Sequence, residues 1–262
     1  MTNGQNDHRL YPGQKLAAKI EAKILHADPA QAAIAIRLDQ LVDRLQTAVL
    51  SRRKWLMVIR QIIGQKLSNL FGRLLSPDRA PVKGLYIYGG VGRGKTMLMD
   101  MFHEAVAAQG LDRPNLPAIW RLHFHDFMVL AQDVIHEARS KGADDPIEMA
   151  AANLARRGAV ICFDEMEVRD IADAMILARL FSGMLKRGVI VVATSNRHAD
   201  DLYKDGLHRD RFLPFIDLLK QRCEMCQLDD GTDWRGAVLA NLPAWHVPVS
   251  YTHLRAHETF AN

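Results

Sequence analysis

The sequence predicts an α/β fold in which helices cover both faces of a parallel sheet. From about residue 84 onward, short apolar stretches alternate with longer stretches in which apolar residues recur at helical spacing. Strands that alternate with helices form parallel sheets, and such sheets are buried on both faces. The expected strands are 85–88, 118–124, 159–163, 189–193 and 223–228, and the expected helices are 96–108, 127–139, 147–156, 171–187 and 212–221.

The composition is that of a soluble globular protein. The chain has 262 residues, of which 48% are apolar, enough for one large domain or two smaller ones. The net charge of +4 permits nucleic-acid binding without indicating it, so no nucleic-acid partner is expected. The sequence has no apolar run of membrane length and no secretory signal. Three cysteines, with Cys162 inside an expected buried strand, fit a reducing compartment, and we expect a cytoplasmic protein.

Residues 1–80 form an expected helical region that precedes the sheet. Apolar residues recur at helical spacing between Ala33 and Leu50, which predicts one long amphipathic helix after a break near Asp28 and Pro29. The α/β core is expected over 81–248. Residues 249–262 are not expected to belong to either part of the fold.

A glycine-rich segment after the first expected strand carries the pattern G-x-x-x-x-G-K-[ST]. Glycines allow consecutive N–H groups to point inward at an anion, and the following helix adds the positive end of its dipole. This geometry suits the phosphates of a nucleotide such as ATP. We expect Lys95 to reach the β- and γ-phosphates and the Thr96 hydroxyl to ligate Mg²⁺. The expected phosphate-binding residues are Gly89, Gly90, Val91, Gly92, Arg93, Gly94, Lys95 and Thr96.

Two adjacent acids, Asp164 and Glu165, follow the strand 159–163 directly. The first can hold Mg²⁺ and its hydration shell, while the second can orient or deprotonate an attacking water. A kinase would not need the second acid, so this pair favours ATP hydrolysis.

Polar residues also follow the strand 189–193, which is expected to lie between the phosphate-loop strand and the Asp164 strand. We choose Asn196, over Thr194 and Ser195, as the residue that senses the γ-phosphate. Further on, Arg209 is the preferred candidate for an arginine finger that reaches a neighbouring subunit's γ-phosphate, with Arg211 second.

Two arrangements that resemble metal sites are interpreted as structural. Cys223 and Cys226 have C-x-x-C spacing, but residues three apart in a strand point to opposite faces. His123 and His125 would share one face of the strand 118–124, yet no third ligand is evident.

The motifs, in this order, resemble the ZapE-type division ATPases of bacteria and their mitochondrial relatives, a branch of the AAA+ ATPases. The resemblance is carried by Asp28-Pro-Ala-Gln31, by the phosphate loop, and by His123-Phe-His-Asp-Phe-Met128, Cys162-Phe-Asp-Glu-Met-Glu-Val168, Asp170-Ile-Ala-Asp-Ala-Met175, Ala193-Thr-Ser-Asn-Arg197, Asp201-Leu-Tyr-Lys-Asp-Gly-Leu-His-Arg209 and Phe212-Leu-Pro-Phe215.

The resemblance implies roles that agree with those assigned from the residues. Asp164 would bind Mg²⁺, Glu165 would act as catalytic base, Asn196 as first sensor and Arg209 as finger. It also implies a homo-oligomeric ring, peripheral to the inner membrane at the division site, that remodels the tubulin-like protein FtsZ. Mitochondrial members instead assist turnover of inner-membrane proteins.

Phe124 or Phe127 would either grip the protein partner or belong to the core.

Two departures from the family pattern limit these expectations. Family members continue past Trp245 into a helical lid, which this chain is expected to lack. Residues 249–262 resemble translated sequencing-adapter read-through, so we treat them as non-native. Two alternatives stay open. One is a nucleotide-binding module with little turnover because the lid is absent, and the other is an ATPase that resembles helicase loaders and acts at nucleic acid.

Overall fold

The computed structural model describes residues 11–63, 82–109 and 119–228, with the backbone alone described for 49–63. Its centre is a five-stranded parallel sheet in the order β2-β3-β4-β1-β5. The strands are β1 (Gly84–Gly89), β2 (Ile119–His123), β3 (Val160–Asp164), β4 (Ile190–Ser195) and β5 (Cys223–Leu228). The expected α/β class is confirmed, while the expected tail 249–262 lies outside the described residues.

The strand order brings three functional strand ends together. β4 pairs with β1 on one side and with β3 on the other, so Val192 lies opposite both Leu85 and Cys162. The predicted position of this strand, between the phosphate loop and the two acids, is confirmed. Ligands of open parallel sheets bind beyond the carboxyl ends of the strands, and at this edge the sequence motifs converge.

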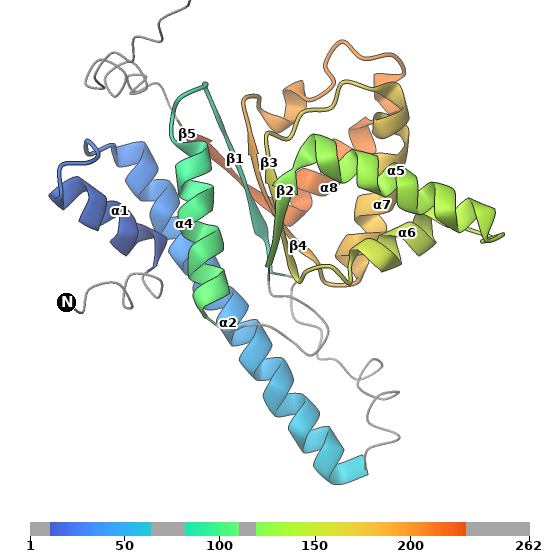
Figure 1. Ribbon diagram of the computed structural model, residues 1–262, viewed down its shortest axis with the longest axis horizontal. Helices are drawn as coiled ribbons and strands as arrows, with labels where there is room; N and C mark the ends of the chain where they lie inside the picture. Colours follow the sequence, from blue (N-terminus) through green and yellow to red (C-terminus); the bar gives the residue numbers. More distant parts are fainter. Residues whose placement is uncertain (1–10, 64–81, 110–118, 229–262) are drawn as a thin grey trace, which may run out of the picture.

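One face of the sheet is covered by α2 (Pro29–Ile63) and α4 (Lys95–Ala108), and α1 (Pro12–Glu21) packs against these two helices (Figure 1). Leu38 and Leu41 of α2 pack there with Phe102 of α4 and with Ile87 of the sheet. The predicted break before α2 is also present. The carboxylate of Asp28 accepts a hydrogen bond from the backbone N–H of Ala30 at 2.8 Å, which satisfies a free donor at the helix start.

The opposite face is covered by α5 (Phe124–Ser140), α6 (Pro146–Leu154), α7 (Ile171–Lys186) and α8 (Leu213–Arg222) (Figure 1). Aromatic rings form the centre of this layer. Phe127 of α5 lies 4.8 Å from Phe163 of β3 between ring centroids, and Phe181 of α7 lies 5.0 Å from Phe215 of α8. Edge-to-face contacts of this kind add to the burial of the rings. None of the helices in the described ranges is long and apolar enough to span a membrane.

The start of α5 corrects two expectations. The helix begins at Phe124, so His125 lies in its first turn, and the expectation that His123 and His125 share a strand face is wrong. Phe124 turns inward against Phe163, with ring centroids 5.5 Å apart, and this packing ends the strand. Phe124 and Phe127 are both buried, which supports the core interpretation and contradicts a gripping role.

The two cysteines of β5 lie as predicted. Cys223 packs in the core beneath α7 and α8, whereas Cys226 packs in the core beneath α2 and α4. They therefore face opposite sides of the sheet. Across the described ranges, no group of three or more His, Cys, Asp or Glu residues could hold a metal by itself.

Candidate active site

The phosphate loop joins the end of β1 to the start of α4. Gly92 and Gly94 adopt left-handed backbone angles, with φ of +82° and +90°, which side chains other than glycine disfavour. A Cβ at Gly94 would also lie 3.0 Å from the Nε2 of Gln31. The two glycines therefore allow the tight turn that aims backbone N–H groups at an anion.

Lys95 lies at the first turn of α4 and folds over the loop. Its Nζ donates hydrogen bonds to the carbonyl oxygens of Gly89 and Gly90, both at 2.7 Å. The residue is 8% exposed, while Thr96 beside it is exposed. Lys95 is thus held at the mouth of the loop, where phosphate oxygens can take the place of the two carbonyl oxygens.

Gln31, near the start of α2, supports the loop from behind. Its Nε2 donates to the carbonyl oxygen of Arg93 at 3.0 Å, and both residues are buried. Because the Arg93 side chain is buried, we expect this residue to contribute its backbone N–H to a phosphate site. The contact with Gln31 joins segments 62 residues apart, and no local pattern in the sequence indicated it.

The two acids at the end of β3 differ in exposure and backbone geometry. Asp164 is buried, whereas Glu165 is exposed and has a φ of +52°, which is uncommon for a residue with a side chain. The Thr194 hydroxyl accepts a hydrogen bond from the backbone N–H of Glu165 at 3.1 Å. The Thr194 carbonyl oxygen accepts another from the N–H of Met166 at 2.7 Å. The neighbouring strand thus holds Glu165 in its unusual conformation.

Ser195 adds a third link between the same segments. Its hydroxyl donates to the carbonyl oxygen of Met166 at 2.8 Å, and Thr194 and Ser195 are both buried. Asn196, the chosen sensor, follows them and is exposed at the carboxyl edge. The structure therefore gives Thr194 and Ser195 supporting roles that sequence reasoning missed, and leaves the Asn196 side chain accessible.

Arg121 of β2 is a second residue that sequence reasoning missed. Its Nε lies 2.7 Å from Oδ2 of Asp164, its Nη2 lies 3.3 Å from Oδ1, and its Nη1 pairs with Asp100 of α4. Burial lowers the pKa of Arg121, but the hydrogen bonds with the two carboxylates outweigh it and raise the pKa above its ordinary value. The signal available in the sequence was one arginine flanked by the apolar residues Trp120 and Leu122 in the middle of the strand.

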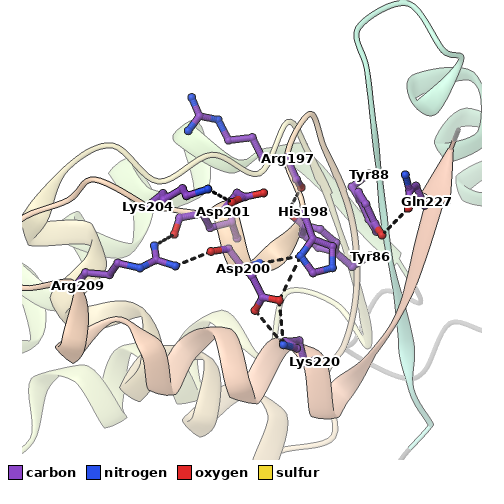
Figure 2. Close-up of polar contacts among 11 residues, drawn as sticks. Tyr86, Tyr88, Arg197, His198, Asp200, Asp201, Lys204, Arg209, Lys220 and Gln227 are labelled. Carbon is purple, nitrogen blue, oxygen red and sulfur yellow. Dashed lines mark hydrogen bonds and ion pairs between the residues drawn. The ribbon is translucent and has the colours of Figure 1, made fainter. Parts of the chain in front are cut away.

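Arg209 lies in a short 3₁₀ turn, Arg209–Arg211, and folds against its own chain (Figure 2). Its Nη1 donates to the carbonyl oxygen of Leu202 at 2.8 Å, and its Nη2 donates to that of Asp200. The Asp200 carboxylate in turn pairs with Lys220 of α8 at 2.9 Å. Arg211, the second candidate, is exposed.

The turn that holds Arg209 also contacts the phosphate-loop strand. The backbone N–H of Asp200 donates to Nδ1 of His198 at 3.2 Å. The His198 ring lies edge-on to the ring of Tyr88, with centroids 4.8 Å apart, as Figure 2 shows. Tyr88 directly precedes Gly89, so the candidate finger and the loop are joined by a short series of contacts.

The donor set fits a magnesium ion bound with a nucleotide. Mg²⁺ is commonly held by one or two carboxylates together with phosphates and waters, so a closed cage of protein ligands is not required. Asp164 supplies a carboxylate and Thr96 an exposed hydroxyl. Arg121 pairs with Asp164 and also with Asp100, which lies one helical turn after Thr96 on α4.

These features define a P-loop protein of the α/β class. The chain belongs to the AFG1-like ATPase family, whose model matches residues 10–260. It is similar to the cell division protein ZapE of Escherichia coli (strain K12), with 40% identity over 186 residues, covering 70% of this chain and 46% of that protein. It is also similar to lactation elevated protein 1 homolog B of Danio rerio, with 45% identity over 164 residues, covering 59% of this chain and 31% of that protein.

The likeness to solved structures is more distant. AMPPCP-bound DnaA from Aquifex aeolicus matches with 15% identity and a TM-score of 0.41, over 67% of this chain and 51% of that one. The chain spans about half the length of the bacterial relative it matches, and less of the zebrafish one.

Proposed function

We propose that this chain carries the nucleotide-binding and hydrolytic core of a Mg²⁺-dependent ATPase. The observation that supports this most strongly is the meeting of three strand ends. β1 leads into the phosphate loop, β3 ends at Asp164 with Glu165 directly after it, and β4 pairs with β3 and binds the Glu165 backbone. Membership in the AFG1-like ATPase family supports the same reaction.

Each residue has a defined part in the proposed reaction. Lys95 and the loop N–H groups bind the β- and γ-phosphates and balance their charge. Glu165, exposed at the sheet edge, orients the attacking water and accepts its proton. Asp164 and Thr96 would hold the metal, which supplies neutralisation of the phosphate oxygens when bound. Asn196 would contact the γ-phosphate and the water.

We further propose that the intact protein acts as a homo-oligomeric ring on a protein partner. Arg209 would reach the γ-phosphate of the neighbouring subunit, after leaving the carbonyl oxygens that hold it in this chain. The similarity to a cell division protein supports a role in bacterial division. Within that role we propose FtsZ at the division ring as the partner. This role places the protein in the cytoplasm, peripheral to the inner membrane.

A second candidate is a nucleotide-binding module with little turnover. The observation that favours it is that Arg209 donates hydrogen bonds to the carbonyl oxygens of Leu202 and Asp200 in its own chain and does not point outward toward a neighbour. Such a chain would bind Mg²⁺-ATP and hydrolyse it slowly.

Steady-state hydrolysis by wild-type and Glu165→Gln chains separates these candidates. If the chain is an ATPase, the substitution lowers turnover by about 10²–10⁴-fold while ATP binding is retained, because only the base is lost. Glu167→Gln is the matched control, since Glu167 is a nearby carboxylate paired with exposed Arg169. Equal turnover by Glu165→Gln and wild type would overturn the assigned base. ATP binding without measurable wild-type turnover would support the module.

A further inference from the structure

We infer that Arg121 is a positioning residue that holds the two expected metal ligands in register before the metal binds. This inference rests on the proposed function, because it concerns the same metal site. Arg121 lies on β2, outside every motif of the sequence. Three features of its surroundings carry the assignment.

The first feature is the fork between Arg121 and Asp164. Two nitrogens of the guanidinium face the two oxygens of the carboxylate, at 2.7 Å and 3.3 Å. A planar guanidinium that meets a carboxylate in this way fixes both the plane and the rotamer of the acid. Asp164 is 7% exposed, so its carboxylate depends on this partner for charge balance.

The second feature is the remaining arm of the guanidinium, which pairs with Asp100 of α4. Residues four apart on a helix share a face, so Asp100 lies on the face that carries Thr96. One side chain therefore ties β3, which presents Asp164, to the helix that presents Thr96. The two expected ligands come from separate elements, and Arg121 bridges these elements directly.

The third feature is that Arg121 leaves room for a metal. A carboxylate offers about four lone-pair sites on its two oxygens, and the guanidinium uses one site on each. The remaining sites can accept a metal ion or its bound water. Arg121 thus orients Asp164 without blocking it, as outer partners of metal ligands commonly do.

Lysine cannot perform this role. It keeps the positive charge but presents a single ammonium in place of a planar fork. Arg121→Lys therefore tests positioning apart from charge. Asp100→Asn weakens the helix arm alone, because the amide oxygen can still accept a hydrogen bond but the negative charge is lost, while the fork to Asp164 remains.

The experiment follows binding of a fluorescent ATP analogue to the full 262-residue chain, in EDTA and across a Mg²⁺ titration. Mg²⁺ is expected to increase the affinity for the nucleotide analogue, and the midpoint is the Mg²⁺ concentration that gives half of this increase. For Arg121→Lys we expect the midpoint to rise about 10–100-fold, the usual loss of metal affinity when an outer partner of a metal ligand is removed. Binding in EDTA should stay at the wild-type value. Asp100→Asn should give a smaller rise in the same direction, and the control Arg169→Lys, at an exposed ion pair with Glu167, should give none.

Two results would overturn the inference while leaving the proposed function intact. One is an unchanged Mg²⁺ midpoint in both Arg121→Lys and Asp100→Asn. The other is an equal loss of nucleotide binding with and without Mg²⁺, which indicates general damage to the sheet. Wild-type binding that ignores Mg²⁺ altogether would overturn the proposed function, and this inference with it. If Arg121→Lys fails to fold, the Asp100→Asn midpoint alone decides.

Discussion

The Thr194 hydroxyl accepts a hydrogen bond from the backbone N–H of Glu165 at 3.1 Å, and Glu165 has a left-handed φ of +52°. Residues with side chains enter this region at a cost of about 1–3 kcal/mol and stay there only when their surroundings hold them. Thr194 on the adjacent strand provides this hold. The position of the proposed catalytic base therefore depends on a residue with no catalytic role of its own.

Thr194→Val is expected to lower ATP turnover about 10–100-fold, because valine keeps the shape of threonine but cannot accept the Glu165 hydrogen bond, and small misplacements of a catalytic group are costly. The free energy of unfolding should fall by about 1 kcal/mol. Steady-state hydrolysis and urea unfolding measure the two effects. Thr194→Ser, which keeps the hydroxyl, should restore most of the turnover. Full activity in Thr194→Val would show that the hydrogen bond is dispensable.

Phe127→Ala is expected to destabilise the chain by about 3–5 kcal/mol, the usual cost of removing a buried aromatic ring. Phe127 is fully buried and contacts the rings of Trp120, Phe163 and Phe181. Urea unfolding measures the loss. Val129→Ala, on the exposed side of the same helix, is the control and should have little effect. An unfolding free energy for Phe127→Ala close to wild type would contradict the core assignment.

Native Cys162 and Cys223 are expected to resist alkylation. Burial raises the pKa of both thiols, that of Cys223 to about 12, so neither forms the reactive thiolate at pH 8.5. Because the folded chain raises the pKa of Cys223, the protonated thiol favours the folded state. This contribution to the free energy of unfolding is fully present below the unfolded pKa of about 8.5 and is lost as pH rises toward about 12.

Iodoacetamide labelling followed by mass spectrometry measures this protection, with and without urea. Slow labelling in buffer and rapid labelling in urea are expected. Rapid labelling of Cys223 in the native chain would contradict its burial between β5 and the helices that cover it.

The elements of the sheet could be predicted from the sequence because they depend on local patterns. The phosphate loop, the acids after β3 and the polar end of β4 each follow an apolar strand, and parallel topology brings such ends to one edge. The start of α5 could not be predicted. Phe124 suits either a strand or a helix, and its packing against Phe163 decided the outcome.

The supporting residues of the site could not be predicted for a related reason. Arg121 and Asp164 are 43 residues apart, and Gln31 and Arg93 are 62 apart. Both contacts form only when the sheet and its helices assemble, so no periodicity or motif indicates them. The roles of the site residues all stay predictions, since they concern a nucleotide, its metal and a neighbouring subunit: Lys95, Thr96, Asp164, Glu165, Asn196 and Arg209.

The most direct test of a nucleotide site at the phosphate loop is calorimetric titration of the 262-residue chain with Mg²⁺-ATP, compared with Lys95→Ala. Lys95 is held at the mouth of the phosphate loop, and hydrogen bonds to charged groups contribute about 1.5–3 kcal/mol. We predict binding to wild type that weakens about 10-fold or more in Lys95→Ala and is unchanged in the surface control Lys141→Ala. Equal affinity of wild type and Lys95→Ala would contradict a nucleotide site at this loop.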